Sequence, residues 1–126
     1  MKALTPQELN VLHLTLKKQW FDMIASGEKK EEYREIKLYW IKRLIDKNLF
    51  DSVPDFMDWL ENPPHGVTLG LVCNNFNWVQ FRNGYSKDAS CMLRHFAGLE
   101  IREGNPEWGA EPGVKYFVIK LGERIK

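Results

Sequence analysis

The sequence predicts an α+β fold, built as a small, mostly antiparallel β-barrel with about three peripheral helices. Three observations predict it: helical patterns lie in the first half of the chain, alternating strand patterns lie mostly in the second half, and 126 residues suffice for one domain. Strands that follow one another with turns between them are expected to pair antiparallel. Residues 11–126 are therefore expected to form a single domain, preceded by an N-terminal extension at residues 1–10.

The first half of the chain opens with a strand and a short helix. Leucines at every second position of Val11–Leu16 predict a strand, and the apolar spacing of Lys17–Ala25 predicts a helix. Gly27 then supplies the residue that can turn left-handed past a helix end. The next segment, Lys29–Ile36, is ambiguous, because its composition favours a helix whereas its place after a helix-stop signal favours a strand.

Two further helices are expected before the strand-rich half. Ile36–Lys47 carries an apolar stripe on one helical face. Pro54–Glu61 follows Ser52, a residue type that caps helix N-termini. Asn62–Gly66 contains two prolines and a glycine and is expected to break the chain.

Four segments of the second half are expected to be strands because apolar residues alternate along them. In the third of these strands the odd-numbered residues from Cys91 to Ile101 are expected to share one face. A turn-rich loop, Gly104–Gly113, separates the last two and has Trp108 at its centre. The four predicted strands are Val67–Cys73, Trp78–Arg82, Cys91–Ile101 and Val114–Leu121.

The overall composition excludes several classes of protein. The 18 basic residues nearly balance the 17 acidic ones, which excludes a polycation that binds duplex nucleic acid by bulk charge. No export signal or membrane-spanning apolar run is recognised, so a cytoplasmic protein without membrane association is expected. The two cysteines are far apart and the three histidines are scattered, so free thiols and no metal or other cofactor are expected.

The charged segment that follows Gly27 carries the strongest functional signal. If it is a strand, Lys30, Glu32 and Arg34 share one face, and one charged row must point toward the barrel interior or its mouth. A buried glutamate is costly unless a cation lies beside it. A polar pocket is therefore expected here, suited to a planar ligand that carries a phosphate.

These residues also carry a resemblance to a known family. Gly27, Lys29, Glu32 and Arg34 match the pattern G-x-K-x-x-E-x-R, placed after a strand and a short helix. With the later runs FRNGY, PEWG and YFVIKLG, the chain resembles an ASCH domain of the PUA-like superfamily. The resemblance covers nearly the whole length outside the first ten residues. It implies a β-barrel with a cleft that binds RNA or nucleotides.

One branch of that family resembles an amidohydrolase acting on acylated cytidine. Its motif has a lysine, a threonine three residues later and a glutamate from a later region. Lys29 matches the lysine, but Glu32 stands where the threonine would be, so the hydroxyl nucleophile of that branch is missing. Thr15 or Ser86 are the substitutes available, and nothing in the sequence places either near Lys29.

The expected function is binding of RNA, single-stranded nucleic acid or a (modified) nucleotide in a polar cleft. Lys29, Glu32 and Arg34 are expected at its centre, with a second group around them. The alternative is a small hydrolase, an amidohydrolase or a ribonuclease, in which Lys29 acts as base and Glu32 assists. A module that binds another protein through its basic face remains a third alternative, and the oligomeric state stays open. The second group consists of Lys17, Arg82, Asn83 and Tyr85.

Overall fold

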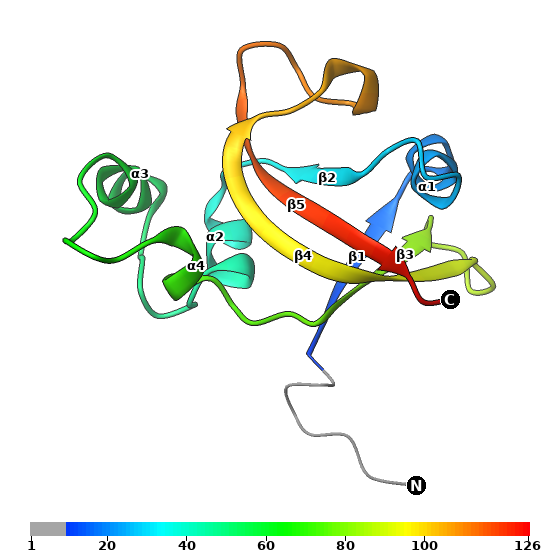
Figure 1. Cartoon of the computed structure of the whole chain (residues 1–126), viewed down its shortest axis with the longest axis horizontal. Helices are drawn as coiled ribbons and strands as arrows, with labels where there is room; N and C mark the ends of the chain where they lie inside the picture. The colour runs from blue at the N-terminus through cyan, green and yellow to red at the C-terminus, as the bar shows by residue number, and fades with distance from the viewer. Residues whose placement is uncertain (1–9) are drawn as a thin grey trace, which may run out of the picture.

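The computed structural model describes residues 10–126, and a curled five-stranded sheet lies at its centre (Figure 1). The strand order is β1-β3-β4-β5-β2, and only the β1–β3 pair is parallel. The predicted α+β class and the mostly antiparallel pairing are therefore confirmed. The sheet forms a half-barrel, because β1 and β2 are its two edges and do not pair with each other. The strands are β1 (Val11–Leu16), β2 (Glu31–Arg34), β3 (Trp78–Asn83), β4 (Cys91–Glu103) and β5 (Lys115–Arg124).

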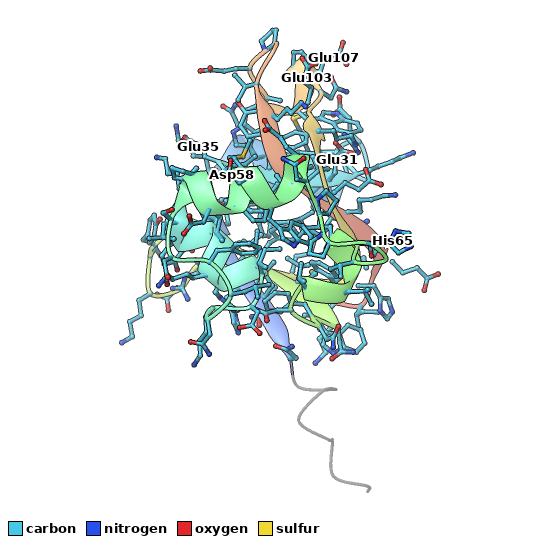
Figure 2. All side chains as sticks on the ribbon, turned by 90° about the vertical axis from the view of Figure 1, so that its left-hand side faces the viewer. Glu31, Glu35, Asp58, His65, Glu103 and Glu107 are labelled. Carbon is cyan, nitrogen blue, oxygen red and sulfur yellow. The ribbon has the colours of Figure 1, made fainter. Side chains whose placement is uncertain are left out.

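Four helices and one 3₁₀ turn occur in residues 10–126, compared with the three helices expected. Helices α2, α3 and α4 gather at one end of the curled sheet and α1 lies at the other (Figure 1). Seen from the first end, α3 lies in front of the strands (Figure 2). None of these helices combines the length and hydropathy needed to cross a membrane. The helices are α1 (Lys18–Ala25), α2 (Leu38–Leu44), α3 (Val53–Glu61) and α4 (Leu69–Val72), and the turn is η1 (Pro106–Trp108).

The predicted strand Val67–Cys73 is wrong, since α4 occupies most of it. Alternating apolar residues favour a strand only where a neighbouring strand can accept the hydrogen bonds. Here the segment lies outside the five-stranded sheet and forms an isolated antiparallel bridge between Cys73 and Ile45. That same bridge ends α2 early, because Ile45 has extended backbone with ψ 173°. The predicted N-cap of α3 is confirmed: Ser52 Oγ accepts from the Asp55 N–H at 3.2 Å.

The predicted orientation of β4 holds only for part of the strand. In its first half Met92 is buried whereas Cys91 is exposed, but farther along Leu99 and Ile101 pack against the core. Two register shifts against β5, between Arg94 and Phe96 and between Phe96 and Gly98, separate these halves. Such a β-bulge reverses which residues face inward and bends the strand. The strong curvature of β4 in Figure 1 follows from them.

The main hydrophobic core lies on the inner face of the sheet. It combines the alternate leucines of β1 with residues of β3, β4 and β5 and of α1, α2 and α3, all nearly inaccessible to solvent. A second, smaller cluster lies on the outer face beneath the 104–113 loop. The inner-face core includes Leu12, Ile24, Ile41, Leu44, Phe56, Val79, Phe81, Phe117 and Ile119, and the outer-face cluster consists of Tyr33, Ala110, Tyr116 and Val118 with Trp108 against it.

Candidate functional site

The direction of the β2 side chains places two charged groups on the inner face of the sheet. Glu32 lies opposite Ile119 of β5, and Arg34 lies opposite Phe117. Directly opposed residues of an antiparallel pair share a face, and both partners belong to the inner-face core. The prediction that a charged row of this segment points inward is therefore confirmed for Glu32 and Arg34.

Lys29 reaches the same place by a different route. It lies before β2 begins, in the turn after Gly27, whose φ of 85° is left-handed. Its N–H donates to the Met23 carbonyl at 3.0 Å, which holds the turn against the end of α1. Strand alternation does not apply at this position. Lys29 is consequently buried, with 1% of its surface exposed, while Lys30 is exposed.

Glu32 is the centre of a buried ion cluster. Its Oε1 accepts from Lys29 Nζ at 2.8 Å and from the Tyr33 N–H at 3.0 Å, and its Oε2 accepts from Arg34 Nη1 at 3.0 Å. Only 4% of Glu32 is exposed. Charges removed from water in this way need close partners, and two cations surround one carboxylate. The cluster therefore carries one net positive charge and favours an anionic ligand.

Aromatic rings and a carbonyl complete the surroundings of Lys29. Its Nζ lies 4.8 Å from the centre of the Trp20 ring and 5.4 Å from that of Tyr33. It also donates to the Trp108 carbonyl at 2.9 Å. Ring faces attract a cation, so these contacts hold the ammonium in place beside the cavity described below.

Arg34 connects the two edges of the sheet. Its Nη1 also donates to the Tyr33 carbonyl at 2.9 Å, and its Nη2 donates to the Thr15 carbonyl of β1 at 3.4 Å. Its Cζ lies 5.2 Å from the centre of the Trp40 ring. A guanidinium has five N–H donors, and within residues 10–126 the Nε–H and one Nη2–H have no acceptor. Arg34 thus keeps donors for a ligand, and 18% of its side chain is exposed.

A cavity of about 250 Å³ opens beside this cluster. Its lining combines three cationic side chains with one carboxylate, two tryptophans and the ends of β1 and β2. A larger hollow of about 530 Å³ between α4 and β4 has no charged residue in its lining, so the smaller cavity is the candidate site. The smaller one is lined by Thr15, Leu16, Lys17, Trp20, Lys29, Glu32, Tyr33, Arg34, Trp108 and Gly109.

A second polar network fastens the 104–113 loop over the cavity. Arg102 donates to both oxygens of Glu31, at 2.8 and 2.9 Å. The Tyr33 hydroxyl donates to Glu31 at 2.6 Å and accepts from the Asn105 N–H at 2.9 Å. The Arg102 hydrogen bonds hold the pKa of Glu31 below its usual range, and burial raises the pKa of Tyr33.

Close backbone packing completes that fastening. Gly109 has a φ of 99°, and a Cβ there would lie 3.0 Å from the Trp20 ring. The loop backbone therefore rests directly on the indole, and the Trp108 carbonyl is brought to Lys29. In Figure 2 the labelled Glu107 marks this loop at the top of the molecule, and Glu103 marks the end of β4 that leads into it.

The sequence-predicted site residues divide into two groups. Lys17, Lys29, Glu32 and Arg34 line the cavity together. Arg82, Asn83 and Tyr85 do not line it: Arg82 donates to the Ser86 carbonyl of its own turn, and Tyr85 is 90% exposed. Arg82 and Asn83 nevertheless lie beside it, because they pair with Thr15 and Leu16.

Sequence reasoning missed several residues that shape the cavity. The sequence predicts that Trp20 is a core residue, and it gives no functional signal for Tyr33 or Gly109. Thr15 lines the same cavity as Lys29, although nothing in the sequence brings them together, whereas Ser86 does not line it. Within residues 10–126 no group of three or more histidine, cysteine or acidic side chains could hold a metal ion. Comparison with protein-family models, with curated proteins and with solved structures found no significant match.

Proposed function

We propose that this protein binds RNA, another single-stranded nucleic acid or a nucleotide in the cavity beside Lys29, Glu32 and Arg34. The observation that carries the proposal is the buried cluster of two cations around one carboxylate, with free N–H donors on Arg34. Such a cluster at a cavity suits a phosphate with a hydrogen-bonding ring attached. The resemblance of Gly27–Arg34 to an ASCH domain points to the same class of ligand.

The side chains have distinct proposed roles. The free N–H groups of Arg34 donate hydrogen bonds to phosphate oxygens, and the exposed Lys17 at the rim of the cavity adds positive charge. Glu32 acts as a positioning residue, since hydrogen bonds already engage both of its oxygens. Lys29 compensates Glu32 and fixes the loop through the Trp108 carbonyl.

The test is a titration of a fluorescent random-sequence RNA hexamer with the wild type and with Arg34→Lys. The substitution keeps the charge but removes the fork that binds phosphate in a bidentate manner. We expect the affinity to fall about ten- to hundredfold, in line with loss of a charge-assisted hydrogen bond of about 1.5–3 kcal/mol. The dissociation constants are measured by fluorescence anisotropy at low salt, where phosphate contacts are strongest.

Arg43→Lys is the matched control. Arg43 is also partly buried, with its Cζ 4.8 Å from the Phe76 ring centre and its Nη2 donating to the Val11 carbonyl, but it does not line the cavity. Its substitution is expected to leave the affinity unchanged. No binding of any RNA by the wild type, or equal loss in both variants, contradicts the proposed site.

A small hydrolase is the second candidate, favoured by one observation: the cavity holds a hydroxyl residue, Thr15, together with Lys29. Against this function, Lys29 Nζ donates in both of its side-chain hydrogen bonds, whereas a general base accepts a proton. Release of product from an acylated cytidine, abolished in both Thr15→Val and Lys29→Met, would favour this second function.

A further inference from the structure

A second hollow continues from the candidate site on the other side of Arg34. It has a volume of about 350 Å³ and shares Tyr33, Arg34 and Gly109 with the first cavity. The side chains that it adds are two aromatic rings, one lysine and two carboxylates. They are Glu35, Lys37, Trp40, Glu111 and Tyr116.

The first cavity is too small for a large ligand. Pockets that enclose small molecules usually have about 300–1,000 Å³, and this one has about 250 Å³. It suits one base or one sugar-phosphate group and excludes a base pair. A ligand that enters it and extends farther reaches the second hollow past the Arg34 side chain.

Arg34 is therefore placed between two compartments and retains free donors. The Nε–H and one Nη2–H lack acceptors in the described part of the chain. A phosphodiester offers two unesterified oxygens with one negative charge, which a guanidinium receives in a bidentate manner. A phosphate at this position would have one substituent in each compartment.

The second compartment contains an aromatic ring and hydrogen-bonding groups that can contact a nucleic-acid base. The Arg34 guanidinium lies over the Trp40 ring, and the ring also forms an edge contact with Tyr39, with ring centres 4.8 Å apart. Indole faces support base stacking. The Tyr116 hydroxyl accepts from the Glu111 N–H at 3.0 Å and, among residues 10–126, has no acceptor for its own proton. It can therefore donate to a base, while the carboxylates of Glu35 and Glu111 can accept from base amino groups.

We infer that the ligand is a single strand of at least two linked nucleotides, with the internucleotide phosphate on Arg34 and the next base on Trp40. This inference rests on the proposed function and narrows it, since a free mononucleotide would leave the second compartment empty. It also distinguishes the site from one that recognises a single modified nucleoside.

The experiment compares three probes by isothermal titration calorimetry: an equimolar mixture of the four ribonucleoside monophosphates, a mixture of dinucleoside monophosphates, and the same dinucleosides with a neutral methylphosphonate link. We expect the charged dinucleosides to bind at least tenfold more tightly than the mononucleotides. The neutral link is expected to remove that advantage, because Arg34 then lacks an anionic partner.

Trp40→Ala locates the second base. It is expected to weaken dinucleoside binding about tenfold, a typical loss for one stacked base, and to weaken mononucleotide binding less. Trp59→Ala is the matched control, because Trp59 is partly buried against the same core but lines neither compartment. Lys37→Glu, at an exposed position, serves as a second variant if Trp40→Ala does not fold.

The outcomes separate the two proposals. Equal affinity for mononucleotides and dinucleosides, or a Trp40→Ala variant that binds both as the wild type does, overturns this inference and leaves the proposed function standing. Absence of binding to any of the three probes and to the RNA hexamer overturns both.

Discussion

Glu32 has the greatest energetic importance of any single residue at the site. It is the only carboxylate in contact with two buried or partly buried cations within residues 10–126. Removing one member of a buried ion pair leaves an uncompensated charge, which usually lowers the free energy of unfolding by about 3–5 kcal/mol. The intact pair contributes far less than this to stability. The importance of Glu32 is therefore visible first in stability and only afterwards in binding.

We expect Glu32→Gln to lower the free energy of unfolding by about 3 kcal/mol. The amide oxygen can still accept from the Tyr33 N–H, but the amide NH2 then faces the Arg34 Nη1 donor, so the loss reports the missing charge together with the missing Arg34 hydrogen bond. Lys29→Met should cost less, since Glu32 keeps Arg34, and the double variant should recover part of the Glu32→Gln loss. Urea denaturation measures all three. The exposed Glu100→Gln serves as control, and a double variant less stable than Glu32→Gln would contradict this account.

Glu31 gives the protein a defined response to acid. Arg102 lowers its folded pKa below 4.5, so Glu31 stabilises the fold at higher pH, and that contribution disappears as the pH falls through the lowered folded value. The free energy of unfolding of the wild type should therefore exceed that of Glu31→Gln, and the difference should be largest at pH 7 and shrink toward zero in strong acid. Urea midpoints measured from pH 7 downward test this expectation. A difference that does not change with pH would show that Glu31 acts through packing alone.

The 104–113 loop is the element on which the shape of the cavity depends. Three of the contacts that fix it involve residues around the cavity: the Tyr33 hydroxyl on the Asn105 N–H, Gly109 against Trp20, and the Trp108 carbonyl on Lys29. A loop joined to β2 and α1 in this way forms a fixed wall of the cavity. Changes within the loop should therefore alter both stability and binding.

Gly104→Ala tests that dependence. An added Cβ would lie 2.6 Å from Tyr33 Cε1 and 2.7 Å from the Ala110 Cβ, so the loop must move. Overpacking of this kind costs about 1–3 kcal/mol, and RNA affinity should fall with it. Gly70→Ala in α4 is the control, since its nearest neighbour would lie 3.9 Å away. We expect that control to gain up to about 1 kcal/mol of stability. Thermal unfolding and RNA titration measure both variants.

Local patterns in the sequence predicted most elements and the centre of the site. Leucine spacing was enough for β1, whereas composition left the segment after Gly27 open between helix and strand, and alternation placed Glu32 and Arg34 on one face only for the strand case. Features that depend on distant partners were not predictable: the segment that forms α4 does not join the sheet, and bulges in β4 and β5 change the inward-facing residues. The Glu31–Arg102 pair joins positions 71 residues apart, and no local signal marks it.

At the scale of the whole molecule, the sheet is most secure along its centre and least secure at its edges. β5 pairs with both β4 and β2, and β4 with both β3 and β5, whereas β1 and the four-residue β2 each pair on one side only. The inner-face core lies against these central strands. Local opening should therefore begin at β2.

Hydrogen exchange followed by mass spectrometry tests this order. Peptides from Leu99–Glu103 and Tyr116–Ile119 should exchange most slowly, at the rate of global unfolding, and peptides over Glu31–Arg34 faster. Binding of the RNA hexamer should slow exchange in Glu31–Arg34 and in the 104–113 loop more than elsewhere. Protection that is uniform across all five strands would contradict this gradient.

The Arg34 side chain also has a consequence for behaviour at high concentration. Unpaired strand edges commonly recruit strands from neighbouring molecules and so begin aggregation. Here the Arg34 guanidinium, on the edge strand β2, donates a hydrogen bond to the Thr15 carbonyl of the other edge strand, β1. Charged residues also make up most of β2. The contact that holds Arg34 beside the cavity thus also occupies an attachment point for intermolecular β-pairing, so Arg34 covers part of this sheet edge as well as lining the proposed binding site.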